Sequence, residues 1–122
     1  MLTIRQAQMR ILAEEGLRRW LYDYLNRCYP SQVQRSGVEG MRLLLKDLMS
    51  KAFRRGFRAA EDVRRYVHVG FLLGPEFEAR QVWARAILDD PELEDPGWRA
   101  KSLEEAAVEF LCPPPPEPAF ED

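Results

Sequence analysis

The sequence predicts an all-α fold: a compact bundle of about five mostly short helices, followed by a disordered, proline-rich C-terminal tail. Three observations lead to this prediction. Apolar residues recur at intervals of three and four positions along most of the chain, which is the spacing that lines one face of an α-helix. Glycine and proline interrupt these patterns where helices would end. No segment shows the alternation of apolar and polar residues that a half-buried strand requires.

Length and composition indicate a single folded unit. The 122 residues are 46% hydrophobic and 31% charged, so the chain has enough apolar side chains for a packed core and is unlike a disordered composition. Domains commonly span roughly 100–200 residues. We therefore expect one helical domain over residues 1–111 and a disordered, acidic, proline-rich tail over residues 112–122.

The first helix is expected to start at a capping box formed by Thr3 and Gln6. It should end before Pro30, because proline disfavours helical geometry in the residue that precedes it. Residues 31–37 are predicted to form a loop. The stripe of this helix that should be buried comprises Leu17, Trp20, Leu21, Tyr24, Leu25 and Cys28.

A second helix is expected over about residues 38–55, with Gly56 in the left-handed conformation that ends it and Phe57 as the accompanying hydrophobic contact. A third begins near Ala60, has acidic residues in its first turn, and ends at Gly74. The second helix should bury Met41, Leu44, Leu45, Leu48, Ala52 and Phe53, and the third should bury Val63, Tyr66, Val67, Gly70 and Phe71.

A fourth helix is expected over about residues 79–88, and a turn follows it at residues 89–92. The last helix should start at Pro96 with Asp95 as its N-cap. The fourth helix should bury Val82, Trp83, Ala86 and Ile87, and the last should bury Leu103, Ala106, Ala107, Phe110 and Leu111. Residues 113–118 contain five prolines, which favour an extended polyproline conformation.

The residues give little support for catalysis, and we predict no enzyme, no cofactor, no metal and no catalytic residue. The chain has one histidine, His68, and its two cysteines lie 84 positions apart, whereas metal sites need several ligands at suitable spacing. We expect His68 to be half-buried with a backbone or water partner. The adjacent acidic pairs, such as Glu104 and Glu105, are expected to be solvated surface because neighbours on a helix point about 100° apart.

Charge is unevenly distributed along the chain. Residues 1–88 hold 16 Lys and Arg against 9 Asp and Glu, whereas residues 89–122 hold 2 against 11. The basic stretch is the candidate partner-binding site, and the residues predicted to bind are Lys51, Arg54, Arg55, Arg58, Arg64 and Arg65. The alternative is an ordinary solvated face held by salt bridges such as Glu61 to Arg65. A sequence pI near 5.5 disfavours nucleic acid as the partner.

The sequence predicts a cytoplasmic protein without a membrane segment. No apolar run approaches the roughly 18 residues of a membrane span. The first six residues carry charge where an export signal would be hydrophobic. Two reduced thiols, Cys28 and Cys112, are expected in preference to a disulfide.

Five segments carry a family resemblance: MLTIRQAQM at residues 1–9, FRRGF at 53–57, EDVRRYV at 61–67, FLLGPEF at 71–77 and WARAILDDP at 83–91. Together they resemble a group of small helical proteins of Gram-negative bacteria, of unassigned activity, that are encoded beside type VI secretion spike, adaptor and toxic-effector genes. The resemblance covers about residues 1–111 and excludes the proline-rich tail. It implies that the gene lies beside type VI secretion genes, and it assigns no catalytic residue to this chain.

The leading hypothesis is a non-enzymatic protein-binding accessory protein that acts as an adaptor or co-chaperone for a type VI secretion effector. The alternative is an immunity protein that neutralises a cognate toxin, for which the acidic residues 89–122 would face a basic cleft. A nucleic-acid-binding regulator is the third hypothesis. The tail is either a linear motif that presents Phe120 to a partner or a dispensable end.

Overall fold

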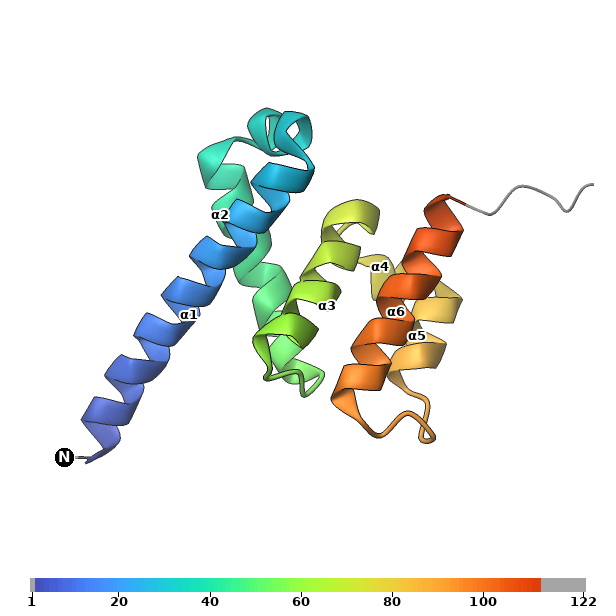
Figure 1. Ribbon diagram of the computed structural model, residues 1–122. Coiled ribbons are helices and arrows are strands. Elements are labelled where there is room, and N and C mark those ends of the chain that lie inside the picture. Colours follow the sequence, from blue (N-terminus) through green and yellow to red (C-terminus); the bar gives the residue numbers. More distant parts are fainter. Residues whose placement is uncertain (1, 113–122) are drawn as a thin grey trace, which may run out of the picture.

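The computed structural model describes the backbone of residues 2–112 and the side chains of residues 13–112. These residues form helices only (Figure 1), which confirms the all-α prediction. The predicted disorder of the proline-rich tail lies outside the described residues. The six helices are α1 (Leu2–Cys28), α2 (Pro30–Arg54), α3 (Ala60–Leu73), α4 (Phe77–Arg80), α5 (Val82–Leu88) and α6 (Pro96–Leu111).

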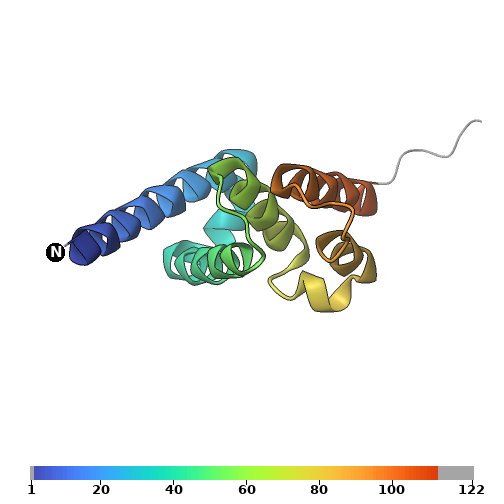
Figure 2. The same ribbon diagram turned by 90° about the horizontal axis from the view of Figure 1, so that it is seen from below.

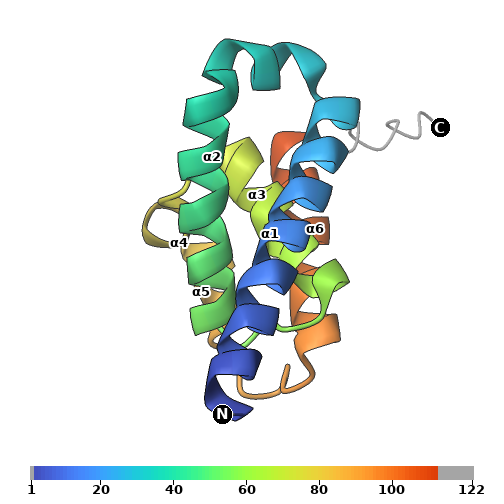
Figure 3. The same cartoon turned by 90° about the vertical axis from the view of Figure 1, so that its left-hand side faces the viewer.

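Helices α1 and α2 form a hairpin with one non-helical residue, Tyr29, between them (Figure 3). The predicted loop at residues 31–37 is wrong, because these residues continue as helix up to a kink at Gly37, where φ is +78°. Pro30 stops α1 as expected, yet it also starts α2, because the first helical position needs no N–H donor. Helix α1 begins at Leu2, ahead of the predicted cap at Thr3; the side chains of the capping box lie outside the described residues.

The outer face of α1 differs from the prediction. Leu21 and Leu25 are fully buried, and Leu17 and Tyr24 pack partly against the core. Trp20 is 38% exposed and Cys28 is exposed, so these two residues lie at the edge of the predicted buried stripe and face solvent. The full cost of truncating a core tryptophan, about 3–5 kcal/mol, therefore does not apply to Trp20.

The end of α2 follows the prediction. Gly56 has φ +93°, its N–H donates to the carbonyl of Phe53, and the N–H of Phe57 donates to the carbonyl of Ala52. These two bonds form a Schellman motif, which satisfies carbonyl groups that a helix end leaves free. The side chain of Phe57 is fully buried. This turn directs the chain back across α2 into α3.

Helix α3 lies at the centre of the molecule, between the α1–α2 hairpin and the group formed by α4, α5 and α6 (Figures 1 and 2). Its predicted start at Ala60 and its end at Gly74 are confirmed. Of the five residues predicted to be buried, four are buried, namely Val63, Tyr66, Val67 and Gly70. The fifth, Phe71, is partly buried.

The predicted fourth helix is two short helices that are separated at Gln81. Its predicted inward face is also wrong, because Val82 is 73% exposed and Ala86 is exposed. Ala84 and Leu88, which are four residues apart, are buried in their place. Trp83 and Ile87 pack partly against the core.

Helix α6 starts as predicted, with the Asp95 carboxylate accepting the Trp98 N–H at 3.2 Å. Leu103 and Ala107 are buried and Ala106 is partly buried, whereas Phe110 and Leu111 are about half-exposed. Both cysteines are exposed and unpaired. None of the helices formed by residues 2–112 combines the length and apolar content that crossing a membrane requires.

Candidate functional site: a basic groove between α1 and α2

Two of the six predicted binding residues form ion pairs that connect distant parts of the chain. The Lys51 ammonium lies 3.2 Å from the Glu76 carboxylate, and the Arg55 guanidinium bonds Glu78 and, at 2.6 Å, Asp89. The hydrogen bond with Glu78 raises the pKa of Arg55. These pairs join α2 to residues 76–89, and the neighbouring carboxylates neutralise the two cations.

Two more of the predicted residues join α3 to α6. Arg64 lies 3.1 Å from Glu104 and donates to the Tyr24 hydroxyl at 3.0 Å. Burial alone would lower the pKa of Arg64, but its hydrogen bond with Glu61 and the charge of Glu104 raise it above the ordinary value. Arg65 lies 3.6 Å from the second Glu104 oxygen. These arginines are therefore part of an internal network.

Glu104 also belongs to a chain of hydrogen bonds through His68. The Nδ1 atom of His68 lies 2.7 Å from a Glu104 oxygen, and Nε2 lies 2.7 Å from the Tyr29 hydroxyl. A carboxylate only accepts hydrogen bonds, so Nδ1 carries a proton and donates to Glu104. The second hydrogen bond joins Nε2 to the Tyr29 hydroxyl. Two predictions are wrong here: His68 is buried with side-chain partners, and Glu104 is not solvated surface.

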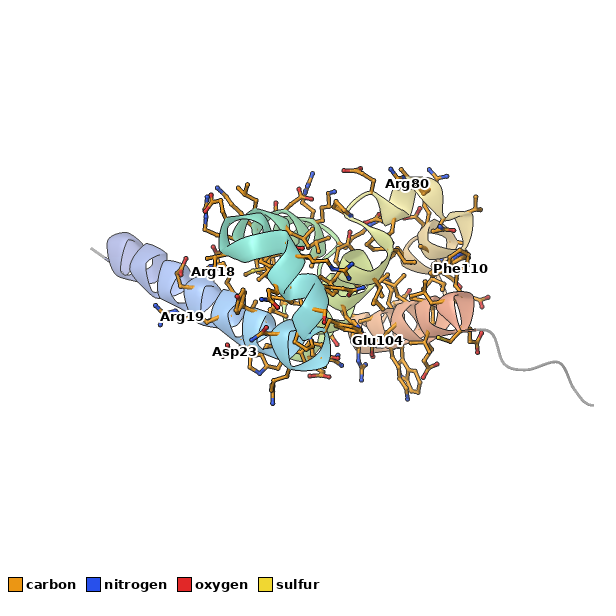
Figure 4. The ribbon with its side chains drawn as sticks, turned by 90° about the horizontal axis from the view of Figure 1, so that it is seen from above. Arg18, Arg19, Asp23, Arg80, Glu104 and Phe110 are labelled. Atoms are coloured by element: carbon orange, nitrogen blue, oxygen red, sulfur yellow. The ribbon has the colours of Figure 1, made fainter. Side chains whose placement is uncertain are left out.

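This network ties three parts of the structure together. Burial raises the pKa of the Tyr29 hydroxyl. The hydrogen bond from His68 lowers the pKa of Glu104, although burial opposes it. Figure 4 shows Glu104 on the side of α6 that faces the α1–α2 hairpin. We interpret the network as an internal clamp.

The remaining two predicted residues, Arg54 and Arg58, line a groove of about 770 Å³ between α1 and α2. Helix α1 contributes its fourth and fifth turns to the groove, and α2 contributes residues of its second half. The full lining is Glu14, Glu15, Arg18, Arg42, Lys46, Met49, Ser50, Phe53, Arg54 and Arg58. Five of these residues are cationic and two are acidic, so the groove is basic.

The cations of the groove differ in how far they are neutralised. Arg18 pairs with Glu15 at 2.8 Å, and Arg42 pairs with Glu39. Lys46 and Arg54 have no ion-pair partner among residues 13–112. Figure 4 shows Arg18 on the side of α1 nearer α2 and Arg19 on the other side. Arg58 has no carboxylate partner among residues 13–112 either, so three cations of the groove are not neutralised.

An apolar strip runs beside these cations. Met49 is only 6% exposed and Phe53 packs partly against the core. The Arg58 guanidinium lies 5.8 Å from the centre of the Phe53 ring and donates at 2.7 Å to the Phe53 carbonyl. Arg58 is thereby fixed over the aromatic face. A ligand in the groove would meet both positive charge and apolar surface.

Sequence reasoning placed the basic site on the second and third helices and missed the contribution of α1. Neither Arg18 nor Lys46 is among the six residues predicted from the sequence. One signal was present in the sequence: Arg42, Lys46, Ser50 and Arg54 recur at every fourth position, which places them on one helix face.

Among the described residues, no group of three or more His, Cys, Asp and Glu side chains could hold a metal ion. Comparison with known proteins adds no relative to this geometry: no protein-family model matches the chain, and neither a curated protein nor a solved structure does.

Proposed function

We propose that this chain is a non-enzymatic protein-binding accessory protein, an adaptor or co-chaperone for a type VI secretion effector, and that it binds through the α1–α2 groove. The observation that carries the protein-binding role is the combination of unpaired cations, Lys46 and Arg54, with an apolar strip in one open groove. The secretion context is supported by the resemblance of the segments in residues 1–111 to proteins encoded beside such systems.

The cations and the apolar strip of the groove contribute to binding in different ways. Exposed cations accelerate encounter with an acidic partner and select against basic ones. Burial of apolar surface contributes roughly 25 cal/mol per Å² before the costs of association. Phe53 is the aromatic side chain in the groove, and aromatic residues in water-excluding pockets dominate many protein interfaces. We expect Phe53 to supply affinity, and Lys46 and Arg54 to supply selectivity.

The groove is a better candidate for the binding face than the six residues predicted from the sequence, most of which lie outside it. Lys51, Arg55 and Arg64 already have carboxylate partners. Reversing their charges would break contacts between helices and unfold or distort the protein. Lys46 and Arg54 can be reversed without breaking an ion pair among residues 13–112.

The test is co-purification of partners from the native host with the charge-reversed variant Lys46→Glu/Arg54→Glu. Its matched control is Arg80→Glu/Arg85→Glu, which changes the net charge equally at exposed arginines outside the groove. We expect the effector encoded nearby, or its adaptor, to co-purify with the control variant and not with the groove variant. Equal recovery with both variants would contradict the groove as the binding face.

One feature favours the alternative role as an immunity protein. Glu105 and Glu109 are exposed on α6, close to the half-exposed Phe110, and this acidic and apolar surface could cover a basic toxin cleft. Glu105→Gln/Glu109→Gln should then abolish inhibition of a toxin encoded nearby. Under the adaptor proposal, the same variant keeps its partner. Glu104 is excluded from this variant because it belongs to the internal clamp.

A further inference from the structure

Four side chains on the α2 side of the groove, three of them cationic, form a regular ladder. Arg42, Lys46, Ser50 and Arg54 are four residues apart and all line the groove. Four residues of α-helix advance about 6 Å, so successive steps of the ladder lie about 6 Å apart on one face. The kink at Gly37 lies outside this stretch, and residues 38–54 are helical. Positive charge is therefore presented on one helix face at Arg42, Lys46 and Arg54, with Ser50 at the intervening step and Arg42 paired with Glu39.

The apolar strip runs parallel to the ladder. Met49 and Phe53 are also four residues apart, and each lies one position before a ladder residue, Ser50 or Arg54. The opposite wall comes from α1, which supplies Arg18. The groove is thus a channel between two helices, with a row of charge and a row of apolar surface that share one direction and one repeat.

An amphipathic α-helix has the complementary pattern. Acidic residues at every fourth position lie about 6 Å apart on one face, and apolar residues three or four positions apart form a stripe beside them. Recognition of such a helix in a groove is an established mode of protein binding. On the strength of the function proposed above, we infer that the groove binds an amphipathic α-helix of another protein, with acidic residues at intervals of four positions.

Two other occupants fit less well. Nucleic acid fits less well because the sequence pI near 5.5 is far below that of a typical nucleic-acid-binding domain. The acidic C-terminal residues of the chain itself have prolines at five of the six positions 113–118, and proline cannot continue a helix interior. A helical segment of another protein satisfies both the charges and the apolar strip.

The test uses the full chain and two labelled synthetic peptides of about 18 residues, long enough to form helix on binding. The first peptide has Glu at every fourth position beside a Leu stripe. The second has the same composition with the Glu residues distributed around the helix. In fluorescence anisotropy, we expect the first to bind at least about tenfold more tightly, a difference of about 1.4 kcal/mol.

Variants of the protein show whether binding occurs in the groove. Lys46→Glu/Arg54→Glu should weaken binding of the patterned peptide by about tenfold or more, and Arg80→Glu/Arg85→Glu should change it by less than about twofold. Circular dichroism confirms that each variant is folded. Phe53→Ala provides a second probe that leaves the charge unchanged, and it should also weaken binding.

The possible outcomes separate this inference from the proposed function. Equal affinity for the two peptides, or no binding of either, overturns the helical partner, while loss of the native partner from the groove variant would still support the adaptor role. A single-stranded RNA oligomer that binds more tightly than the patterned peptide and displaces it would also overturn the inference, in favour of nucleic acid. Recovery of the native partner with Lys46→Glu/Arg54→Glu contradicts the proposed function itself.

Discussion

At the scale of single residues, Glu104 shows how one partly buried carboxylate connects distant parts of the chain. It accepts from His68 on α3 and from Arg64, and through His68 it reaches Tyr29 at the junction of α1 and α2. Its side chain is 20% exposed, so burial disfavours the charge while the two donors, His68 and Arg64, favour it. The net result is a lowered pKa.

We expect Glu104→Gln to destabilise the protein by about 2 kcal/mol at pH 7, because hydrogen bonds to a charged group contribute about 1.5–3 kcal/mol. A group with a lowered pKa adds stability above its unfolded pKa, near 4.5 here, and this stability is lost as pH falls through the folded pKa. Urea denaturation should therefore show the difference between wild type and variant shrinking toward pH 3. Glu105→Gln, at the exposed neighbour, should stay within about 0.5 kcal/mol of wild type.

Gly70 is a second residue whose identity is fixed by its neighbours. A Cβ added there would overlap the Cδ2 atom of Leu48 and lie 3.0 Å from its Cδ1 atom, and Leu48 is fully buried. Overpacking costs about 1–3 kcal/mol, which exceeds the gain of up to about 1 kcal/mol from replacing glycine in a helix. We expect Gly70→Ala to lose about 1 kcal/mol in chemical denaturation. Gly16→Ala, where a Cβ meets no atom within 4 Å, should gain stability; a gain at both sites would contradict this account.

At the scale of elements, the sequence predicts helix ends better than it predicts helix faces. The end of α2 and the start of α6 depend on neighbouring residues alone, through the left-handed Gly56 and the cap at Asp95. The stretch 31–37 was misread because its polar residues suit a loop as well as a solvated helix. Its helical state depends on Pro30 opening a new helix next to α1.

The face of α5 was misread for a related reason. Seven residues make about two turns, too few for the apolar spacing to decide between Val82 and Ala84 as the inward residue. Helix α6 packs against α5, and this packing selects Ala84 and Leu88. The candidate site was predicted only in part, because pairs such as Arg55 with Asp89 join residues 34 positions apart. Which arginines are neutralised is thus a property of tertiary packing that local sequence does not contain.

The turn after α2 yields a prediction at this scale. Gly56 has φ +93°, and a residue with a Cβ pays about 1–2 kcal/mol in the left-handed region. We expect Gly56→Ala to lower the free energy of unfolding by about 1 kcal/mol, measured by urea denaturation. The control is Gly40→Ala within α2, where the nearest atom to an added Cβ is 3.8 Å away; it should be neutral or stabilising. Equal effects would show that this turn does not need a glycine.

At the scale of the whole molecule, α3 is the element that joins two groups of helices. It packs against α1 and α2 on one side and against α4 and α6 on the other. Ion pairs of Lys51 and Arg55 with residues 76–89 are a second connection between the two groups. The buried side chains nevertheless form one continuous core, which extends from Leu21 on α1 to Leu103 on α6. A continuous core of this size favours cooperative, two-state unfolding.

Three tryptophans allow this cooperativity to be measured on each side of α3. Trp20 lies on α1, whereas Trp83 and Trp98 lie on α5 and α6. Replacing two of the three by Phe leaves one fluorescent reporter in a chosen group. If α3 couples the groups, unfolding in urea followed by Trp20 alone, by Trp83 alone and by circular dichroism should have one common midpoint.

Val67 on α3 then provides the decisive perturbation, because its side chain is fully buried. Val67→Ala removes two carbons from the core, at about 0.8 kcal/mol each plus a term for the cavity left behind, so we expect a loss of about 2 kcal/mol. Since α3 belongs to both groups, the Trp20 and Trp83 reporters should shift by the same amount. Val82→Ala, at a site that is 73% exposed, should shift neither. A shift confined to one reporter would mean that the hairpin and the α4–α6 group unfold separately, and that the clamp through Tyr29, His68 and Glu104 does not couple them.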